Sequence, residues 1–404
     1  MTINGGEVEL LSLSYRRSDL DLSCRRHSVR TDAAIRQSAI QQHPGETMVR
    51  RESSPLIVRQ QTPDNREGPP EVFETPMTPT ERFFVRNHFD VPDLDADSWS
   101  LQVDGAVDRS RSWGLDDLQR FDQKTVAATL ECAGNGRAQL GDRASGVAWQ
   151  QGAIGTASWR GVVLSQLLDE TGLDDGVEEL IFVGADRGPV ETADGGSIQT
   201  PYARSLPVEK AMSDDVIIAT AMNGEPLTPE HGYPGRLLVA GWYGMASVKW
   251  LVRILAIPDH FQGYFQTEDY AIWEYNDGLP VRCPLGSMAV KSHIGHPVDG
   301  QRLTAGDTVT IEGFAWGGEG SIDVVEVSVD GGDTYSDADL LDSPHRHSWQ
   351  RWSYTWEVPQ DPKQTTLLSR ARTDEGEVQP CDHDWRKGAY EVNMIRPVDV
   401  VISK

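Results

Sequence analysis

The most restrictive feature of the sequence is a change in hydrophobic periodicity at about residue 288. Before that point, short strand-like runs alternate with a few helical ones; after it, alternating apolar and polar residues take over. A period of two buries one face of a sheet, whereas a period of 3.6 buries one side of a helix. The sequence therefore predicts an α+β domain over residues 71–285, followed over residues 288–404 by an all-β sandwich of the immunoglobulin-like type.

Local signals divide these two regions further. The segment GVVLSQLLDETGL has apolar residues at Val162, Val163, Leu167 and Leu168 and ends at Gly172, which predicts a helix. A Gly-Gly pair at residues 331–332 separates VEVSVD from DTYSDADL and predicts a hairpin. The segment 283–295 is expected to link the two domains.

Residues 1–70 are polar, rich in Arg, Gln and Ser, and interrupted by Pro, so we expect a disordered arm there. Met48 offers an alternative start. No apolar run reaches the roughly 20 residues that a membrane-spanning helix needs. Neither pair of arginines near the amino terminus precedes an apolar segment typical of a signal peptide, and the expected location is the cytoplasm.

The charge balance excludes some partners. Among 404 residues there are 37 Lys and Arg against 62 Asp and Glu, a net charge of −25. Such an acidic chain is not expected to bind nucleic acid or anionic lipid. Because few of its basic residues are Lys, the composition also predicts a halophilic source. The four cysteines are widely spaced without a C-x-x-C pair, so neither a disulfide framework nor a zinc ribbon is indicated.

Cys132 is the first candidate for chemistry. It ends an apolar run and precedes Ala-Gly-Asn-Gly-Arg, so a tight glycine-rich turn presents the thiol with Arg137 five residues on. A nearby cation favours the thiolate, which can act as a nucleophile or bind a metal. On residue type alone, a buried structural cysteine explains the position at least as well.

Two other polar groups have settings that suit a pocket. Arg86, Asn87 and His88 interrupt an aromatic run, where the arginine could bind an oxyanion through paired donors. Asp269 and Tyr270 place a phenol beside a carboxylate, and the phenol could donate to a bound oxyanion. Taken alone, the first group also fits a solvated edge strand, and the second a half-buried strand tyrosine.

A third group consists of cations in a segment rich in turns. His231, Arg236 and Lys249 lie in a stretch rich in Gly and Pro that can bring them together, and backbone amides of GWYGMASVK could line a phosphate. Individually each could be a surface residue. Together, in a chain with few lysines, they favour an anion site.

In this order, the segments resemble the sulfite oxidase family of molybdopterin oxidoreductases. The resemblance extends from about residue 78 to the carboxyl terminus and includes FFVRNHFDVP, TLECAGNGR, MNGEPL with the following HGYP, GMASVKW and VEVSVDGG. It implies a catalytic domain that binds molybdenum and molybdopterin, followed by the family's dimerisation sandwich, and hence a homodimer.

The resemblance also implies roles for particular residues. Cys132 would be the only protein ligand of molybdenum, its thiolate being a soft donor. The residues implied to hold the pterin and its phosphate are Phe84, Arg86, Asn87, His88, Asp186, His231, Arg236, Ser247, Val248 and Lys249. Those implied to form the oxyanion pocket are Arg86, Arg137, Trp149 and Tyr270, with Asp269 beside the tyrosine.

The reaction implied is oxidation of sulfite to sulfate, with electrons passed to a separate acceptor because no haem domain is recognised. Three departures from the family pattern reduce the expected positive charge. Gly136 replaces a pocket arginine, and a basic residue expected shortly before Trp149 is Ser145, with Arg143 as a possible substitute. A further arginine is expected from the second domain, with Arg351 as the nearest candidate.

Two alternatives remain open at this stage. The same cofactor could run in the reducing direction, with nitrate or a sulfoxide as substrate. The chain could also be a non-catalytic binding protein on the same scaffold. Retention of Arg86, Arg137 and Tyr270 favours sulfite, and the intact Cys132 argues against a protein that has lost its metal.

Overall fold

The computed structural model describes residues 55–192, 194–342 and 346–404, so the arm expected over residues 1–54 lies outside it. Residues 55–70, expected to belong to that arm, instead contain a hairpin of β1 (Ile57–Gln60) and β2 (Asn65–Glu67). Asn65 and Glu67 are almost fully buried. The prediction was wrong here because the hairpin is anchored by polar side chains, which a search for apolar periodicity does not detect.

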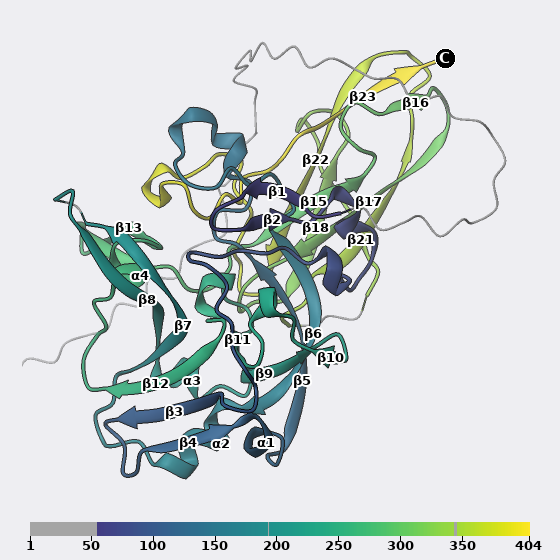
Figure 1. Cartoon of the computed structure of the whole chain (residues 1–404). Helices are drawn as coiled ribbons and strands as arrows, with labels where there is room; N and C mark the ends of the chain where they lie inside the picture. Colours follow the sequence, from purple (N-terminus) through teal and green to yellow (C-terminus); the bar gives the residue numbers. More distant parts are fainter. Residues whose placement is uncertain (1–54, 193, 343–345) are drawn as a thin grey trace, which may run out of the picture.

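Two five-stranded sheets form the first domain (Figure 1). One is antiparallel and consists of β5 (Gln123–Glu131), β6 (Ile154–Val163), β9 (Val216–Met222), β10 (Glu225–Pro226) and β11 (Arg236–Val239). The other has the order β4-β3-β12-β7-β8 and includes one parallel pair, β3 with β12. Its strands are β3 (Ser100–Gly105), β4 (Arg111–Gly114), β7 (Glu179–Glu191), β8 (Ser197–Pro207) and β12 (Leu251–Ile257).

Among the residues that the structure describes, helices are few and short. They are α1 (Leu115–Leu118), α2 (Leu164–Thr171), α3 (Val208–Ala211) and α4 (Tyr264–Thr267). The helix predicted around Leu167 and Leu168 is confirmed, but Val162 and Val163 belong to β6, and α2 begins only at Leu164. Gly172 ends α2 with a φ of +68°, a conformation that glycine adopts without a steric penalty.

The 3-10 turns lie in loops. They are η1 (Pro70–Glu74), η2 (Thr80–Arg82), η3 (Arg137–Arg143), η4 (Pro229–His231), η5 (Gly244–Ala246) and η6 (Trp385–Lys387). Four of them, η3, η4, η5 and η6, contain residues that line the site described below. Much of the site is therefore built from loops at the ends of strands. Among the described residues, no helix is long and apolar enough to cross a membrane.

The second domain packs two sheets against a shared apolar core. The first consists of β15 (Lys291–His296), β17 (Thr308–Trp316), β20 (Asp339–Leu340) and β21 (Gln350–Glu357); the second consists of β16 (Arg302–Thr304), β18 (Ile322–Ser328), β19 (Ser336–Asp337), β22 (Gln364–Thr373) and β23 (Val398–Ser403). The hairpin predicted at residues 331–332 is confirmed, because β18 pairs with β19. The all-β prediction for this region is therefore confirmed.

A separate hairpin precedes the second domain. Strands β13 (Ala271–Asn276) and β14 (Leu279–Pro284) pair with each other in a two-stranded sheet. Since β14 reaches residue 284 and β15 starts at residue 291, the linker is shorter than the expected 283–295 and comprises residues 285–290.

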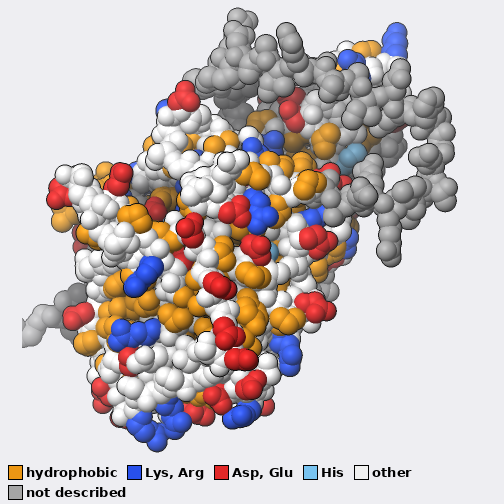
Figure 2. Space-filling model, in the orientation of Figure 1, with side chains coloured by type: hydrophobic (Ala, Val, Ile, Leu, Met, Phe, Trp, Pro, Cys, Tyr) orange, Lys and Arg blue, Asp and Glu red, His pale blue; other side chains and the backbone are white. Residues whose placement is uncertain are grey.

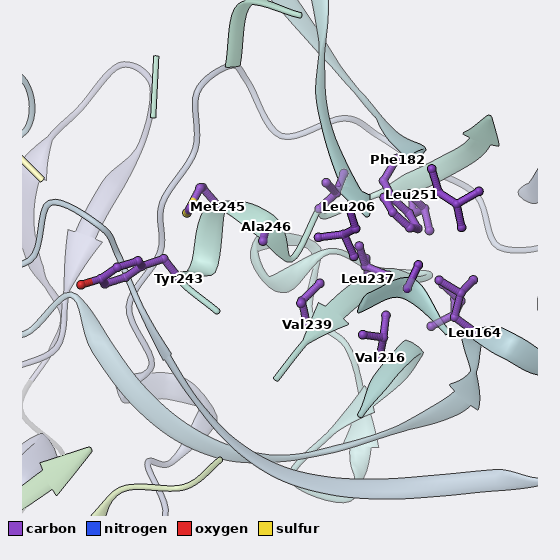
Figure 3. Packing of buried hydrophobic residues seen from close by; sticks show 14 of the residues in the cluster. Leu164, Phe182, Leu206, Val216, Leu237, Val239, Tyr243, Met245, Ala246 and Leu251 are labelled. Atoms are coloured by element: carbon purple, nitrogen blue, oxygen red, sulfur yellow. The ribbon is translucent and has the colours of Figure 1, made fainter. Parts of the chain in front are cut away.

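The main core of the first domain joins its two sheets (Figure 3). Side chains from both sheets and from α2 meet there, including Leu164, Phe182, Leu206, Val216 and Leu237, all fully buried. On the face drawn in Figure 2, acidic and basic side chains are intermixed with hydrophobic ones. The strands and their shared core form the layers, and the loops between strands carry many of the polar side chains of the site.

Candidate active site

Cys132 directly follows β5 and is the first residue of a tight turn. Its backbone N–H donates to the carbonyl of Ala153 (2.9 Å), and its own carbonyl accepts from the N–H of Asn135 (2.8 Å). The Asn135 side chain adds two bonds, donating to Glu131 Oε1 (2.9 Å) and accepting from the N–H of Ala153 (3.1 Å). The turn is therefore fixed on both sides, and the buried thiol has a defined position.

A first cavity opens on one side of the thiol. Its wall is formed by Phe83, Phe84, Arg86, Asn87, His88, Leu130, Cys132, Ala133, Asp186, Tyr202, Glu230, His231, Arg236, Gly244, Met245, Ser247, Lys249, Trp250 and Tyr270. These residues come from segments that span most of the first domain. Ten of the sequence-predicted residues besides Cys132 line this cavity.

The N-terminal hairpin holds one wall of this cavity. Asn65 Oδ1 accepts a hydrogen bond from the backbone N–H of Asn87 (2.8 Å), and the Asn87 amide donates to the carbonyl of Asp64 (2.9 Å). Lys249 Nζ donates to both Asn87 Oδ1 and the carbonyl of Glu230. Asn87 thus connects the N-terminal hairpin with Lys249. The buried Asn65 side chain holds the Asn87 backbone in this position.

The first cavity buries three basic side chains, His231, Arg236 and Lys249. Burial, with Lys249 and Arg236 nearby, lowers the pKa of His231 to about 3, and burial lowers the pKa of Arg236 to about 9. Burial also lowers the pKa of Lys249, despite the attraction of Asp186. Burial disfavours the charged form of each basic group, so the pKa values fall even with Asp186 and Glu230 in the wall. A bound anionic group such as a phosphate would compensate for it.

Two buried polar atoms in the same wall have no partner among the described residues: His231 Nε2 and Asp186 Oδ1. Burial raises the pKa of Asp186 to about 6. Buried polar atoms normally form hydrogen bonds, so these two indicate a polar ligand in the cavity. The cations and the orphaned donor and acceptor fit a pterin with its phosphate.

A second cavity adjoins the first at the thiol. It is lined by Arg59, Gln60, Pro63, Arg86, His88, Cys132, Arg137, Ser145, Gly146, Val147, Ala148, Glu268, Asp269, Tyr270, Ala271, Trp273, Arg282, Trp385, Arg386, Lys387, Gly388, Ala389 and Tyr390. Cys132, Arg86, His88 and Tyr270 line both cavities. A group bound to the Cys132 sulfur would therefore lie where the two spaces meet.

Tyr270 connects the residues at this junction. Its hydroxyl accepts from Arg86 Nη2 (3.3 Å) and lies 2.7 Å from His88 Nε2. Burial and the Arg86 charge lower the pKa of His88 well below its ordinary value, whereas burial raises the pKa of Tyr270. The imidazole is consequently neutral and the phenol is protonated, so the hydroxyl can donate to His88 or to a bound oxyanion.

The cations of the second cavity fall into two classes. Arg59, Arg386 and Lys387 each form an ion pair with a carboxylate, namely Glu67, Asp384 and Glu391 respectively. Arg137 instead donates to the carbonyls of Ala389 (3.0 Å) and Val147 (3.3 Å), and Arg282 to those of Thr267 and Glu268. Arg86 also donates only to neutral groups. In the described part of the chain, these three guanidinium groups keep their full charge for an anion.

Two predicted residues do not line either cavity. Trp149 is fully buried behind the cysteine turn, where its carbonyl accepts from the N–H of Ala138 (3.0 Å). Val248 points into the main core of the first domain. Residues directly next to each of them do line a cavity. The motifs therefore identified the right segments, but these two side chains are not part of the wall.

The candidate substitutes for missing cations also lie elsewhere. Arg143 stacks its guanidinium 4.2 Å from the centre of the exposed Trp385 ring and is absent from the cavity wall. Arg351, on β21, forms a two-point ion pair with Asp342 and is absent from the walls of both cavities. The second domain instead contributes residues around η6, including Lys387 and Tyr390.

Several wall residues escaped the sequence analysis. Arg59 lies in the segment that was expected to be disordered, and Arg282 lies in β14, directly before the expected linker. Tyr390 begins YEVNMIRPVDVVI, a stretch with strand-like alternation, but that pattern does not indicate that the tyrosine reaches the pocket. For Arg59, the strand-like run LIVRQ was the one available signal in the sequence.

Comparison with known families agrees with the geometry. Residues 88–265 match the oxidoreductase molybdopterin binding domain, and residues 283–395 match the Mo-co oxidoreductase dimerisation domain. The first match contains Cys132 and most residues of the first cavity. The second contains η6 and Tyr390.

Individual relatives cover most of the chain. It is 37% identical over 342 residues to mitochondrial sulfite oxidase of Homo sapiens, and the match covers 80% of this chain and 61% of the human protein. Sulfite oxidase of Arabidopsis thaliana is 32% identical over 353 residues, covering 80% and 88% respectively. The chain thus spans about three-fifths of the length of its mammalian relatives. Nitrate reductase [NADH] 1 of Arabidopsis thaliana is 31% identical, and the match covers 37% of it.

One solved structure is similar over nearly the whole chain. The sulfane dehydrogenase SoxCD from Paracoccus pantotrophus superimposes with a TM-score of 0.75 at 30% sequence identity. The match covers 89% of this chain and 92% of that one. The two-domain arrangement is therefore shared along with the individual domains.

Proposed function

Because the chain belongs to the sulfite oxidase family of molybdopterin-dependent oxidoreductases, we propose that it oxidises sulfite to sulfate. The observation that carries this proposal is the position of Cys132 at the junction of two cavities. One cavity fits an anionic pterin, and the other has uncompensated guanidinium groups for an oxyanion. A soft thiolate between them is a suitable ligand for molybdenum.

The first cavity would hold the cofactor. His231, Arg236 and Lys249 would bind its phosphate, and Asp186 would accept hydrogen bonds from the pterin. When bound, the molybdenum and molybdopterin supply the two-electron oxidation of substrate and the transfer of oxygen to it. No cluster of three or more His, Cys, Asp or Glu residues in the described chain could hold a metal. A metal with Cys132 as its protein ligand would thus depend on the pterin for further donors.

The second cavity would bind and orient the substrate. Sulfite and water yield sulfate, two protons and two electrons, so the pocket must accept one oxyanion and release another. Arg86 and Arg137 offer charge-assisted hydrogen bonds, and the protonated Tyr270 can donate a further one. Fixed donors of this kind stabilise a developing charge without reorganisation at the moment of reaction.

Further proposals concern the assembly. The match of residues 283–395 to a dimerisation domain supports a homodimer, and the two packed sheets support an immunoglobulin-like topology. The matched regions are a cofactor-binding and a dimerisation domain, and we propose that a separate molecule accepts the electrons. Sedimentation of the purified chain, and reduction of external one-electron acceptors, test these two points.

The charge balance supports one proposal about the setting. A net charge of −25 suits a protein that stays soluble at high salt, and we propose a halophilic source. Unfolding temperatures measured from low to molar salt should rise with salt concentration. A stability that does not depend on salt would contradict halophily.

Steady-state turnover tests the proposed substrate. The full chain, loaded with molybdenum cofactor, should oxidise sulfite when ferricyanide is supplied as acceptor, and it should reduce nitrate and dimethyl sulfoxide much more slowly when supplied with reduced dye. The Cys132→Ser variant serves as the control for contaminating activity. Faster reduction of nitrate or the sulfoxide than oxidation of sulfite would favour the reductase alternative.

A further inference from the structure

Three successive residues of the second domain each hold a different part of the oxyanion pocket. The backbone N–H of Glu391 donates to the carbonyl of Ala133, next to Cys132 (2.9 Å). The carbonyl of Ala389 accepts from Arg137 Nε (3.0 Å). Between them, the hydroxyl of Tyr390 donates to Asp269 Oδ1. Residues 389–391 therefore contact the cysteine turn, a pocket arginine and the carboxylate beside Tyr270.

The Tyr390 ring also lies against both substrate-side residues. Its centre is 5.2 Å from that of Tyr270, and the Arg137 guanidinium carbon lies 5.3 Å from it. The hydroxyl accepts a long hydrogen bond from the backbone N–H of Tyr270 (3.5 Å). Tyr270 has a φ of +55°, which is unfavourable for a bulky residue and needs support from surrounding contacts.

Asp269 creates a problem for an anion pocket that Tyr390 can resolve. A carboxylate in the wall of the second cavity repels an oxyanion and attracts the cations that would bind it. Because burial and the Asp269 charge raise the pKa of Tyr390, its hydroxyl remains a donor throughout the physiological range. The carboxylate then has a neutral hydrogen-bond partner, and the guanidinium stays available.

We propose that Tyr390 is a positioning residue of the oxyanion pocket, which holds Asp269 and Tyr270 in place and supports Arg137 from the second domain. The proposal rests on the proposed function only in taking an oxyanion as the ligand.

The test uses sulfate, a non-reacting oxyanion, as the probe. Its dissociation constant is measured by calorimetry on the full, cofactor-loaded chain, together with the kinetics of sulfite oxidation. For Tyr390→Phe we expect sulfate binding to weaken and the KM for sulfite to rise about tenfold, the usual effect of losing one hydrogen bond in a charged network. We expect kcat to change less than threefold, and the unfolding temperature to stay near that of the parent chain because the ring is kept.

Tyr335 provides a matched control. It also lies in the second domain, has Arg370 stacked on its ring (4.7 Å) and carries a raised pKa because of burial. Tyr335→Phe should leave the sulfate dissociation constant and the KM within twofold. If both substitutions changed the sulfate dissociation constant and the KM equally, the cause would be a general loss of order in the second domain. That result would overturn the proposal.

A second background isolates the role of Asp269. In an Asp269→Asn chain, Tyr390→Phe should change the sulfate dissociation constant by less than twofold, because the carboxylate is already gone. A tenfold effect in both backgrounds, or in neither, contradicts the mechanism. An enzyme whose sulfate affinity responds as expected but which does not oxidise sulfite would contradict the proposed function alone.

Discussion

Lys291 Nζ lies 3.0 Å from Glu131 Oε1, and Glu131 is the residue directly before Cys132. Both side chains are at most 5% exposed. The other Glu131 oxygen accepts from the indole of Trp316 (2.8 Å), which also belongs to the second domain. The cysteine turn is therefore tied to the second domain by a buried, hydrogen-bonded ion pair.

Breaking this pair from one side should be strongly destabilising. Glu131→Gln leaves the Lys291 charge buried without its counter-ion, and we expect a loss of about 3–5 kcal/mol in the free energy of unfolding. The double variant Glu131→Gln/Lys291→Met removes both charges and should recover much of that loss. Denaturant unfolding of the three proteins checks this. A double variant less stable than the single one would contradict the account.

Cys132→Ser should abolish turnover while leaving the fold intact. Serine is close in size to cysteine and keeps the backbone hydrogen bonds of the turn, but its hydroxyl is a poor ligand for a soft metal. Circular dichroism and the unfolding temperature should match the parent, whereas sulfite oxidation should fall to background. Retention of activity would remove the role assigned to Cys132.

Arg86→Gln should chiefly raise the KM for sulfite. The substitution removes a half-buried guanidinium that donates only to neutral groups, so the pocket loses one full charge. We expect a rise of roughly ten- to a hundredfold, typical of a lost charge-assisted hydrogen bond. Arg120→Gln, at an exposed surface ion pair with Asp117, is the control and should have no effect. An unchanged KM in Arg86→Gln would mean that the pocket lies elsewhere.

Contacts between the domains should weaken in acid. Although burial opposes it, the hydrogen bond with His347 lowers the pKa of Asp215, and Lys210 likewise lowers that of Glu319. These carboxylates stabilise the fold above the ordinary carboxyl pKa of about 4, and their contribution is lost as the pH falls through the lower folded-state values. Asp215→Asn should lower the unfolding temperature at pH 7.

The same variant should show a smaller further drop between about pH 5 and pH 3, because its side chain no longer takes up a proton. Unfolding temperatures of Asp215→Asn and the parent across this range measure the difference. Parallel curves would show that Asp215 does not contribute to the acid sensitivity.

Much of the fold was predictable because it depends on apolar periodicity. The helix containing Leu167 and Leu168 and the strands of the second domain repeat at the spacing of their buried faces. The N-terminal hairpin was missed because Asn65 and Glu67 hold it through hydrogen bonds. Polar anchoring of this kind has no periodic signal in the sequence.

The site was predictable where its residues lie in continuous motifs. Cys132, Arg86 and His231, which line the cavities, belong to the motifs TLECAGNGR, FFVRNHFDVP and HGYP. Tyr390 and Arg282 were not predicted, since each reaches the cavity only through the packing of the second domain and of the β13–β14 hairpin. Such residues are brought to the pocket by tertiary structure, which no local pattern encodes.

The central claim is that sulfite donates electrons at the site next to Cys132. Anaerobic stopped-flow addition of sulfite to the purified, molybdenum-loaded chain in high-salt buffer, followed through the absorption of the oxidised cofactor, tests it directly. The account predicts rapid bleaching that saturates with sulfite and is absent in Cys132→Ser. No bleaching in a sample with confirmed molybdenum would contradict it, and reoxidation of the pre-reduced enzyme by nitrate or a sulfoxide would then identify a reductase.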